Sequence, residues 1–273
     1  MTRRLPSRPP KTLVVLALIS VSLFLLPLAG LLWRAPWSKF GKYVFDSDSV
    51  DALRISLQTS LLSTLLSIVF GVPLAWVLAR VEFRGRSVVR ALCTLSMVLP
   101  PVVGGVALLY ALGRRGLVGQ WLDKWFDIQL PFTTTAVVIA QTFVAMPFMV
   151  VTVEAAIRAL DRRYEETART LGASQWRVFW LITMPAVGPS LVAGAVLSWA
   201  RALGEFGATI TFAGNFPGTT QTLPLSVYQA LEVNPEKAIV LALLLVALSF
   251  AVLVGLRDRW LSGVISARGR SAS

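Results

Sequence analysis

The sequence predicts an all-α integral membrane protein with six transmembrane helices and both termini on the cytoplasmic side. Hydrophobic residues make up 55% of the 273 residues, and the mean hydropathy is +0.69, whereas soluble domains are about 45–50% apolar. The excess is gathered in blocks of about 20 residues, the length that crosses a hydrocarbon core about 30 Å thick. Basic residues flank the blocks, so the net charge of +12 indicates membrane topology rather than nucleic-acid binding.

Six apolar blocks have the required length. They cover residues 13–33, 55–79, 88–112, 133–157, 178–200 and 238–256, between tails at 1–12 and 257–273. The first block follows four basic residues, which leaves a signal peptide as the competing interpretation. Its length exceeds a signal core of about 7–15 residues and no A-x-A-like site follows, which favours an uncleaved span.

Prolines interrupt several blocks. They are Pro73, Pro100, Pro101, Pro147, Pro185 and Pro189. Proline removes a backbone donor and kinks a helix, which a bundle tolerates where neighbouring groups satisfy the freed carbonyls. The stretch LPPVVGG at 99–105 suits a bundle that moves, although a static packing kink explains any single proline equally well.

The basic residues are shared unequally between the two sides of such a bundle. With a cytoplasmic N-terminus, 17 of the 26 Lys and Arg residues fall in inner segments. This bias predicts an N-in and C-in topology. It also places the loop after the fourth span in the cytoplasm.

That loop contains a charged, amphipathic segment at 161–177. Asp161 can cap a first helix, in which apolar residues recur at i, i+4 and i+7 and form one face. Gly172 follows the last of them, where a left-handed helix terminator is favoured. Ser174 can cap a second helix. The segment is therefore predicted to be a helix–Gly–helix elbow at the membrane surface.

The elbow also carries a longer motif, E-x-A, three residues, G, nine residues and I-x-x-P, which begins at Glu166. This spacing resembles the EAA loop of ABC-importer permeases, with Thr167 at the usual Ala and Met184 at the usual Leu. The resemblance implies the type I ABC importer permease fold (MetI-like) and a coupling loop seated on an ATPase subunit. The coupling residues it implies are Glu166, Thr167, Ala168, Gly172, Ser174, Trp176, Ile182 and Pro185.

A second block, residues 201–228, reads RALGEFGATITFAGNFPGTTQTLPLSVY. It resembles the segment of molybdate permease subunits that carries GEFGAT, FAGN and TQTLPL, whereas sulfate permeases share only the R-A-x-G-E start. The resemblance implies a permease for molybdate, with sulfate, thiosulfate or tungstate as the alternative. Many Gly, Thr, Asn and Gln residues and few charges suit passage of a tetrahedral dianion without trapping it.

Candidate pathway and gate residues come from the third span, from the end of the fifth span and from this second block. Arg201 and Glu205 are four residues apart, and the sequence leaves open a structural ion pair and a role for Arg201 in the anion path. The candidate set is Pro100, Pro101, Gly104, Trp199, Arg201, Glu205, Thr209 and Asn215.

The chain has no G-x-x-x-x-G-K-[ST] phosphate loop, no His and a single cysteine, Cys93. We therefore expect no nucleotide site, no zinc site of the usual Cys/His kind and no cofactor in this chain. The resemblance implies a homodimer with two ATPase subunits that bind ATP and Mg, and an extracytoplasmic molybdate-binding protein. It also implies a multi-pass location in the bacterial cytoplasmic (inner) membrane, surrounded by lipid, and no nucleic-acid partner.

Three other interpretations are less consistent with the sequence. A secondary transporter would normally show inverted repeats or buried carboxylates within its spans, and these blocks are nearly free of acids. A membrane-embedded enzyme needs a nucleophile or acid–base set, which the residues do not supply. The elbow alone is also compatible with an interfacial amphipathic helix that has no partner.

Overall fold

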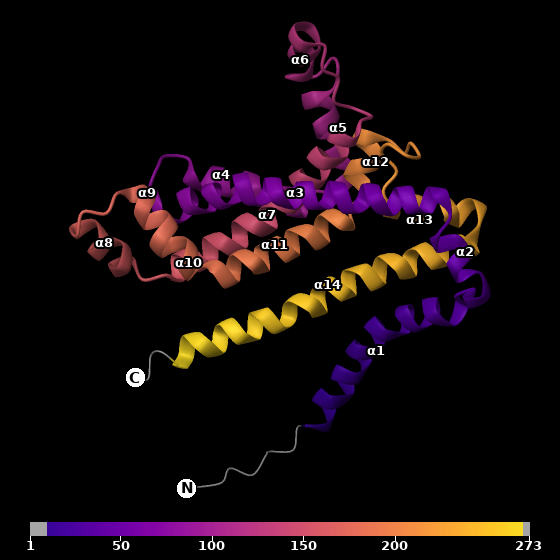
Figure 1. Ribbon diagram of the computed structural model, residues 1–273, viewed down its shortest axis with the longest axis horizontal. Coiled ribbons are helices and arrows are strands. Elements are labelled where there is room, and N and C mark those ends of the chain that lie inside the picture. Colours follow the sequence, from indigo (N-terminus) through magenta and orange to yellow (C-terminus); the bar gives the residue numbers. More distant parts are fainter. Residues whose placement is uncertain (1–9, 270–273) are drawn as a thin grey trace.

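The structure, a computed structural model, describes residues 10–269, and their side chains as far as residue 252. Within that range every regular element is a helix, which confirms the all-α prediction (Figure 1). Most of the predicted N-terminal tail and residues 270–273 of the predicted C-terminal tail lie outside the described residues.

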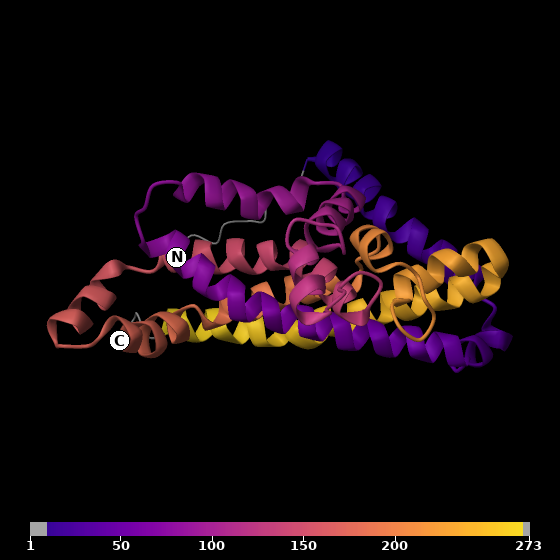
Figure 2. The same ribbon diagram turned by 90° about the horizontal axis from the view of Figure 1, so that it is seen from above.

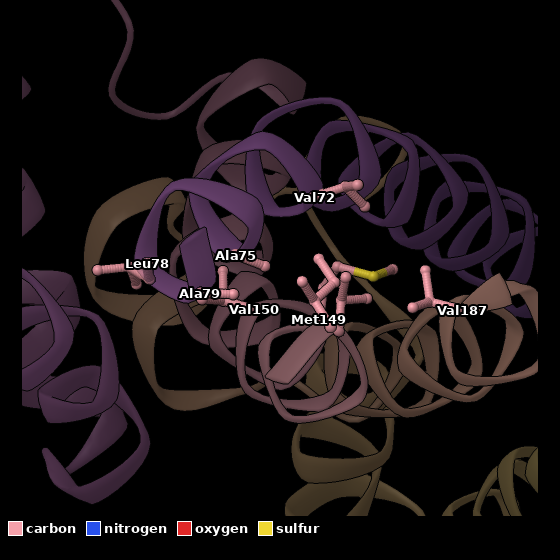
Figure 3. Packing of buried hydrophobic residues seen from close by; sticks show 9 residues of the cluster. Val72, Ala75, Leu78, Ala79, Met149, Val150 and Val187 are labelled. Atoms are coloured by element: carbon pink, nitrogen blue, oxygen red, sulfur yellow. The ribbon is translucent and has the colours of Figure 1, made fainter. Parts of the chain in front are cut away.

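Three long helices lie together and form the core (Figure 1). They are α3 (Ser47–Arg80), α7 (Thr134–Ala159) and α11 (Gly188–Leu203). Small residues let α3 and α7 approach closely, since a Cβ added at Gly71 would lie 3.2 Å from Cγ of Met149. Figure 3 shows the buried cluster at this contact, in which Met149 packs with Val72, Ala75 and Val150.

Hydroxyl side chains line the buried face of α3. Thr59, Thr64 and Ser67 each donate to the carbonyl one turn earlier, at 2.7–2.8 Å. Such bonds satisfy hydroxyls where no water is available. The predicted second span, which starts at Ile55, lies within this helix, and the helix itself begins at Ser47.

The first and last helices lie at the edge of the bundle (Figures 1 and 2). They are α1 (Lys11–Arg34) and α14 (Pro235–Gly269), and α14 packs against α13 (Leu223–Val233). Between α1 and α3 lie the short helices η1 (Trp37–Lys39) and α2 (Phe40–Val44). Lys39 Nζ lies 2.7 Å from the carboxylate of Glu236, whose hydrogen bond and charge raise the pKa of Lys39. No residue of α1 is buried in the chain, so its apolar surface is free to face lipid or protein.

The predicted third span is divided into two helices, α4 (Arg86–Val98) and α5 (Pro101–Leu112). Leu99 and Pro100 between them have extended backbones, with ψ of 131° and 129°. Proline at 100 disfavours helical geometry at the residue before it, and two successive prolines lack two backbone donors. The break is therefore stronger than the predicted kink. Beyond it, α5 and the short helix α6 (Gly119–Phe126) project away from the bundle beside α12 (Gly207–Ala213) (Figure 1).

The predicted fifth span is bent. It consists of α9 (Gln175–Val178), the π-helical turn η2 (Phe179–Thr183), α10 (Met184–Ala186) and α11, with a bend of 74° between the segment 175–186 and α11. The bend lies where Pro185 and Pro189 interrupt the backbone hydrogen bonds, which is a common cause of helix kinks.

Four of the described helices are long and apolar enough to cross a membrane: α1, α3, α7 and α14. A fifth crossing results when the bent segment from α9 to α11 is counted as one span. The structure thus shows a multi-helix membrane architecture, and the sixth crossing predicted at 88–112 falls on the divided pair α4 and α5.

Candidate functional site: the elbow and the α5–α12 contact

The elbow, residues 161–177, contains α8 (Arg162–Thr170) and the start of α9, joined through Gly172. Both predicted caps are present: Asp161 accepts a hydrogen bond from the Arg163 amide at 3.0 Å, and Ser174 accepts one from the Arg177 amide at 3.3 Å. Gly172 has φ of +87°, the left-handed conformation that favours glycine. The helix–Gly–helix prediction is therefore confirmed.

Large apolar side chains on the elbow are exposed within this chain. Of the predicted apolar face of α8, Tyr164 is 64% exposed and Leu171 is 84% exposed. Trp176, at the start of the second helix, is 70% exposed. An uncovered apolar surface on a short polar loop is typical of a protein-docking or membrane-contact site. Among the predicted coupling residues, Glu166, Thr167 and Pro185 are also exposed, while Ala168 and Ile182 are half-buried.

One elbow residue that the motif does not include is buried. The carboxylate of Glu165 lies 3.0 Å from Nε of Arg80, at the end of α3, and it accepts a hydrogen bond from the Thr183 hydroxyl at 3.0 Å. Arg80 also donates to the carbonyl of Leu160 at 3.2 Å. The sequence motif points to the neighbouring Glu166 and assigns no role to Glu165, because a pairing across 85 residues leaves no local pattern.

A second charge cluster lies beside the elbow. The carboxylate of Glu154, in α7, is 5% exposed and forms ion pairs with Arg90 at 2.8 Å and Arg158 at 2.7 Å. Both arginines and Arg86 also donate to the carbonyl of Leu78, at 2.8–3.4 Å. The last carbonyls of a helix lack helical partners and carry its negative dipole end, so three cations stabilise the end of α3. The sequence analysis used these arginines only to assign topology.

The α5–α12 contact brings together part of the predicted pathway set. A Cβ added at Gly105 would lie 2.7 Å from Cβ of Thr211 and 2.8 Å from the carbonyl oxygen of Ala208. A Cβ added at Gly207 would lie 2.9 Å from Cβ of Pro101. The two helices therefore touch at their backbones. Gly104, a predicted gate residue, packs instead against the ring of Phe143 in α7, and its neighbour Gly105 is not among the predicted residues.

Two predicted pathway residues carry buried polar atoms that have no hydrogen-bond partner among the described residues. They are Trp199, through its indole Nε1, and Thr209, through its hydroxyl. Unpartnered buried polar groups are costly, and four residues outside the predicted pathway set share this feature: Ser49, Ser63, Gln141 and Thr222. Asn215 lies apart from them in the loop after α12, where it bonds to the side chains of Gln221 at 3.0 Å and Gln229 at 3.3 Å.

Arg201 and Glu205 form the predicted ion pair. The Glu205 carboxylate is 1% exposed, and it also accepts a hydrogen bond from the Ala208 amide at 2.8 Å, in the first turn of α12. Glu205 thus ties the end of α11 to the start of α12. This second bond favours the structural interpretation of the pair.

Replacing Arg201 with Gln is expected to destabilise the protein by about 3–5 kcal/mol, because it leaves a buried carboxylate without its cation. The double variant Arg201→Gln and Glu205→Gln should recover stability, since a Gln oxygen can still accept from the Ala208 amide. Melting in detergent and transport activity are the measurements. A double variant that is stable but does not transport, beside a Glu205→Gln variant that does, would instead place Arg201 in the anion path.

Comparison with known proteins identifies the family. The model of the family described as binding-protein-dependent transport system inner membrane component matches residues 67–263. The chain belongs to this family. Its members are permease subunits of ABC importers and lie in a membrane, which agrees with the apolar helices of this chain.

The curated relatives include permease proteins of molybdenum and sulfate transport systems. The molybdenum transport system permease protein ModB of Mycobacterium tuberculosis is 44% identical, over 93% of this chain and 96% of that protein. ModB of Escherichia coli K12 is 39% identical, over 78% of this chain and 93% of that protein. The sulfate transport system permease protein CysT of E. coli K12 is 36% identical, over 77% of this chain and 76% of that protein.

Solved structures of ABC transporters share the fold. A chain of a bacterial transporter that imports the polysaccharide alginate has a TM-score of 0.73 at 17% identity, over 92% of this chain and 94% of that chain. A chain of the MetNI methionine transporter, in inward-facing conformations, has a TM-score of 0.61 at 19% identity, over 79% of this chain and 95% of that chain. These similarities confirm the MetI-like permease fold that the sequence predicts.

Proposed function

We propose that this chain is the membrane-spanning subunit of an ATP-driven importer for molybdate. In this proposal the permease has six spans with both termini inside, and it lies in the bacterial inner membrane as a homodimer. Two ATPase subunits bind ATP and Mg at its cytoplasmic face, and an extracytoplasmic molybdate-binding protein delivers the ion. Two relatives named molybdenum transport system permease protein, which match 93% and 78% of the chain, support the choice of molybdate.

The observation that carries the proposal is the elbow. It presents a capped pair of short helices on which Tyr164, Leu171 and Trp176 are exposed. Such a surface needs a partner, and an ATPase groove would cover it. Closure of the ATPase dimer would then move the elbow and, through it, the spans. The exposed Glu166 of the motif is free to take part in that docking.

The path for the ion is proposed to open at the α5–α12 contact. There the backbones touch at Gly105 and Gly207, so in this conformation no ion passes between the two helices. The unpartnered Nε1–H of Trp199 and hydroxyl of Thr209 are donors, which suit an oxyanion when the helices move apart. We place alternating access here because the glycines allow closure without side chains in between.

The deciding experiment is transport by the purified complex in liposomes. We expect ATP-dependent uptake of molybdate when the permease is combined with its ATPase and binding protein, and much less uptake of sulfate at equal concentration. Uptake should cease when ATP is replaced by a non-hydrolysable analogue. Preferential uptake of sulfate would replace molybdate by the second candidate, which the 36% identity to CysT supports.

A further inference from the structure

Two adjacent glutamates on α8 have opposite surroundings. Glu166 belongs to the family motif and is exposed, whereas Glu165 is 7% exposed and faces its own chain. Of the nine residues of α8, Glu165 is the only one that is buried. The attachment of α8 to the rest of the protein therefore depends mainly on the side chain of Glu165.

The first contact of Glu165 is to the end of α3. Its two oxygens lie 3.0 and 3.2 Å from Nε of Arg80, whose side chain is 8% exposed. The other end of the same guanidinium donates to the carbonyl of Leu160, directly before the Asp161 cap. Arg80 thus holds the elbow both at its entry and within its first helix. Because the pair is shielded from water, its attraction is stronger than that of a surface ion pair.

The second contact of Glu165 is to the bend in the fifth span. The hydroxyl of Thr183, which is fully buried, donates to Oε1 of Glu165 at 3.0 Å. Thr183 is the last residue of the π-helical turn η2, just before the 74° bend. Turns of this kind interrupt the regular hydrogen bonds of a helix and are frequent at functional sites.

We propose that Glu165 is the joint of the elbow: a positioning residue that fixes α8 to α3 and to the bend of the fifth span, so that a pull on the elbow moves both spans together. The inference rests on the proposed function for its transport consequence. Its mechanical basis is the pair of contacts alone. Without the carboxylate, Arg80 and Thr183 have no common partner, and the elbow can shift without moving the spans.

The transport test compares Glu165→Gln with Glu82→Gln in the reconstituted complex. Glu82 is exposed, lines the same hollow beside Arg80 and forms no ion pair among the described residues, so it is the matched control. We expect Glu165→Gln to co-purify with the ATPase and to hydrolyse ATP, while molybdate taken up per ATP falls at least about fivefold. Glu82→Gln should keep the wild-type ratio. A wild-type ratio in Glu165→Gln would overturn the proposal.

Charge reversal separates a joint from a simple loss of folding. The variant with Arg80→Glu and Glu165→Arg restores an ion pair, and the Thr183 hydroxyl can accept as well as donate. We expect it to recover part of the uptake per ATP that either single change loses, since a carboxylate at position 80 cannot replace the bond that Arg80 donates to the Leu160 carbonyl. If Glu165→Gln does not assemble, Thr183→Val removes one hydroxyl at nearly constant shape and should lower the ratio. An assembled charge-reversal protein without recovery, or a Thr183→Val protein with the wild-type ratio, contradicts the joint.

A distance measurement tests the joint without ATPase or substrate. In a Cys93→Ser background, spin labels at Arg84→Cys and Tyr164→Cys report on the turn between α3 and α4 and on α8, and both positions are exposed. The full chain in lipid nanodiscs, diluted with unlabelled chain, should give a narrow distance distribution that Glu165→Gln broadens. An unchanged distribution overturns the joint. If Glu165→Gln broadens the distribution but the wild type takes up no molybdate, the joint stands and only the proposed function is overturned.

Discussion

Replacement of Glu154 by Ala is expected to lower the free energy of unfolding by about 3 kcal/mol, the largest stability loss that we predict for a single side chain in α7. The variant leaves Arg90 and Arg158 side by side, both still directed at the Leu78 carbonyl and neither with a carboxylate. The figure is at the lower end of the range for breaking a buried pair, because the arginine side chains remain 33% and 45% exposed and water screens them.

Thermal unfolding of the detergent-solubilised protein, followed by size-exclusion chromatography, measures this effect. Glu232→Ala is the control, because Glu232 is exposed and forms no ion pair within the part of the chain that the structure describes. Glu154→Gln should fall between the two, since its amide oxygen can still accept from one arginine. Equal melting of Glu154→Ala and Glu232→Ala would mean that the arginines are satisfied by the α3 carbonyls alone.

The elbow shows how far local sequence rules reach. Asp161, Gly172 and Ser174 were each predicted from their own neighbours, and all three have the predicted geometry. A cap or a left-handed terminator depends on a few adjacent residues, so a short stretch of sequence determines it. The helical extent of α1 and α7 was likewise predictable, because a long apolar block has few alternatives in a membrane.

The charge clusters show where such rules stop. Glu154 pairs with Arg90 across 64 residues, and Glu165 pairs with Arg80 across 85. No periodicity connects residues so distant, and the sequence alone offered only a count of arginines near the inner ends of spans. One signal was available: Glu154 is an acid within an otherwise apolar block, and an ionisable residue in a span indicates a partner or a function. Glu154 is thus an exception to the expectation that the spans are nearly free of acids.

The change of direction between α4 and α5 at Pro100 also could not be predicted from the sequence. A proline pair predicts an interruption but not its angle, which depends on what the following helix packs against. Here α5 is directed away from α4 because Gly105 fits against the backbone of α12, about 100 residues later in the chain. The glycines that allow this contact could be read from the sequence as permissive positions. Their partner could not.

Replacement of Gly105 by Ala is expected to separate α5 from α12. We expect its effect on transport to exceed that of a methyl group added at any other position of the predicted pathway. The new Cβ would lie 2.7 Å from Cβ of Thr211 and 2.8 and 3.0 Å from two backbone atoms of Ala208. Backbone atoms cannot rotate out of the way as a side chain can, so the helices must shift. Overpacking of this kind costs about 1–3 kcal/mol.

That cost applies only to a conformation in which the two helices touch. If the contact opens during transport, Gly105→Ala favours the open state, and each 1.4 kcal/mol changes the ratio of closed to open molecules about tenfold. We therefore expect higher ATP hydrolysis without the binding protein and lower uptake of molybdate per ATP. Gly104→Ala is the matched control, because its Cβ would meet side-chain atoms alone, the ring of Phe143 at 3.0 Å and Cδ2 of Leu99 at 3.9 Å, and side chains can move. Identical behaviour of the two variants would show that the α5–α12 contact stays closed throughout the cycle and that the ion passes elsewhere.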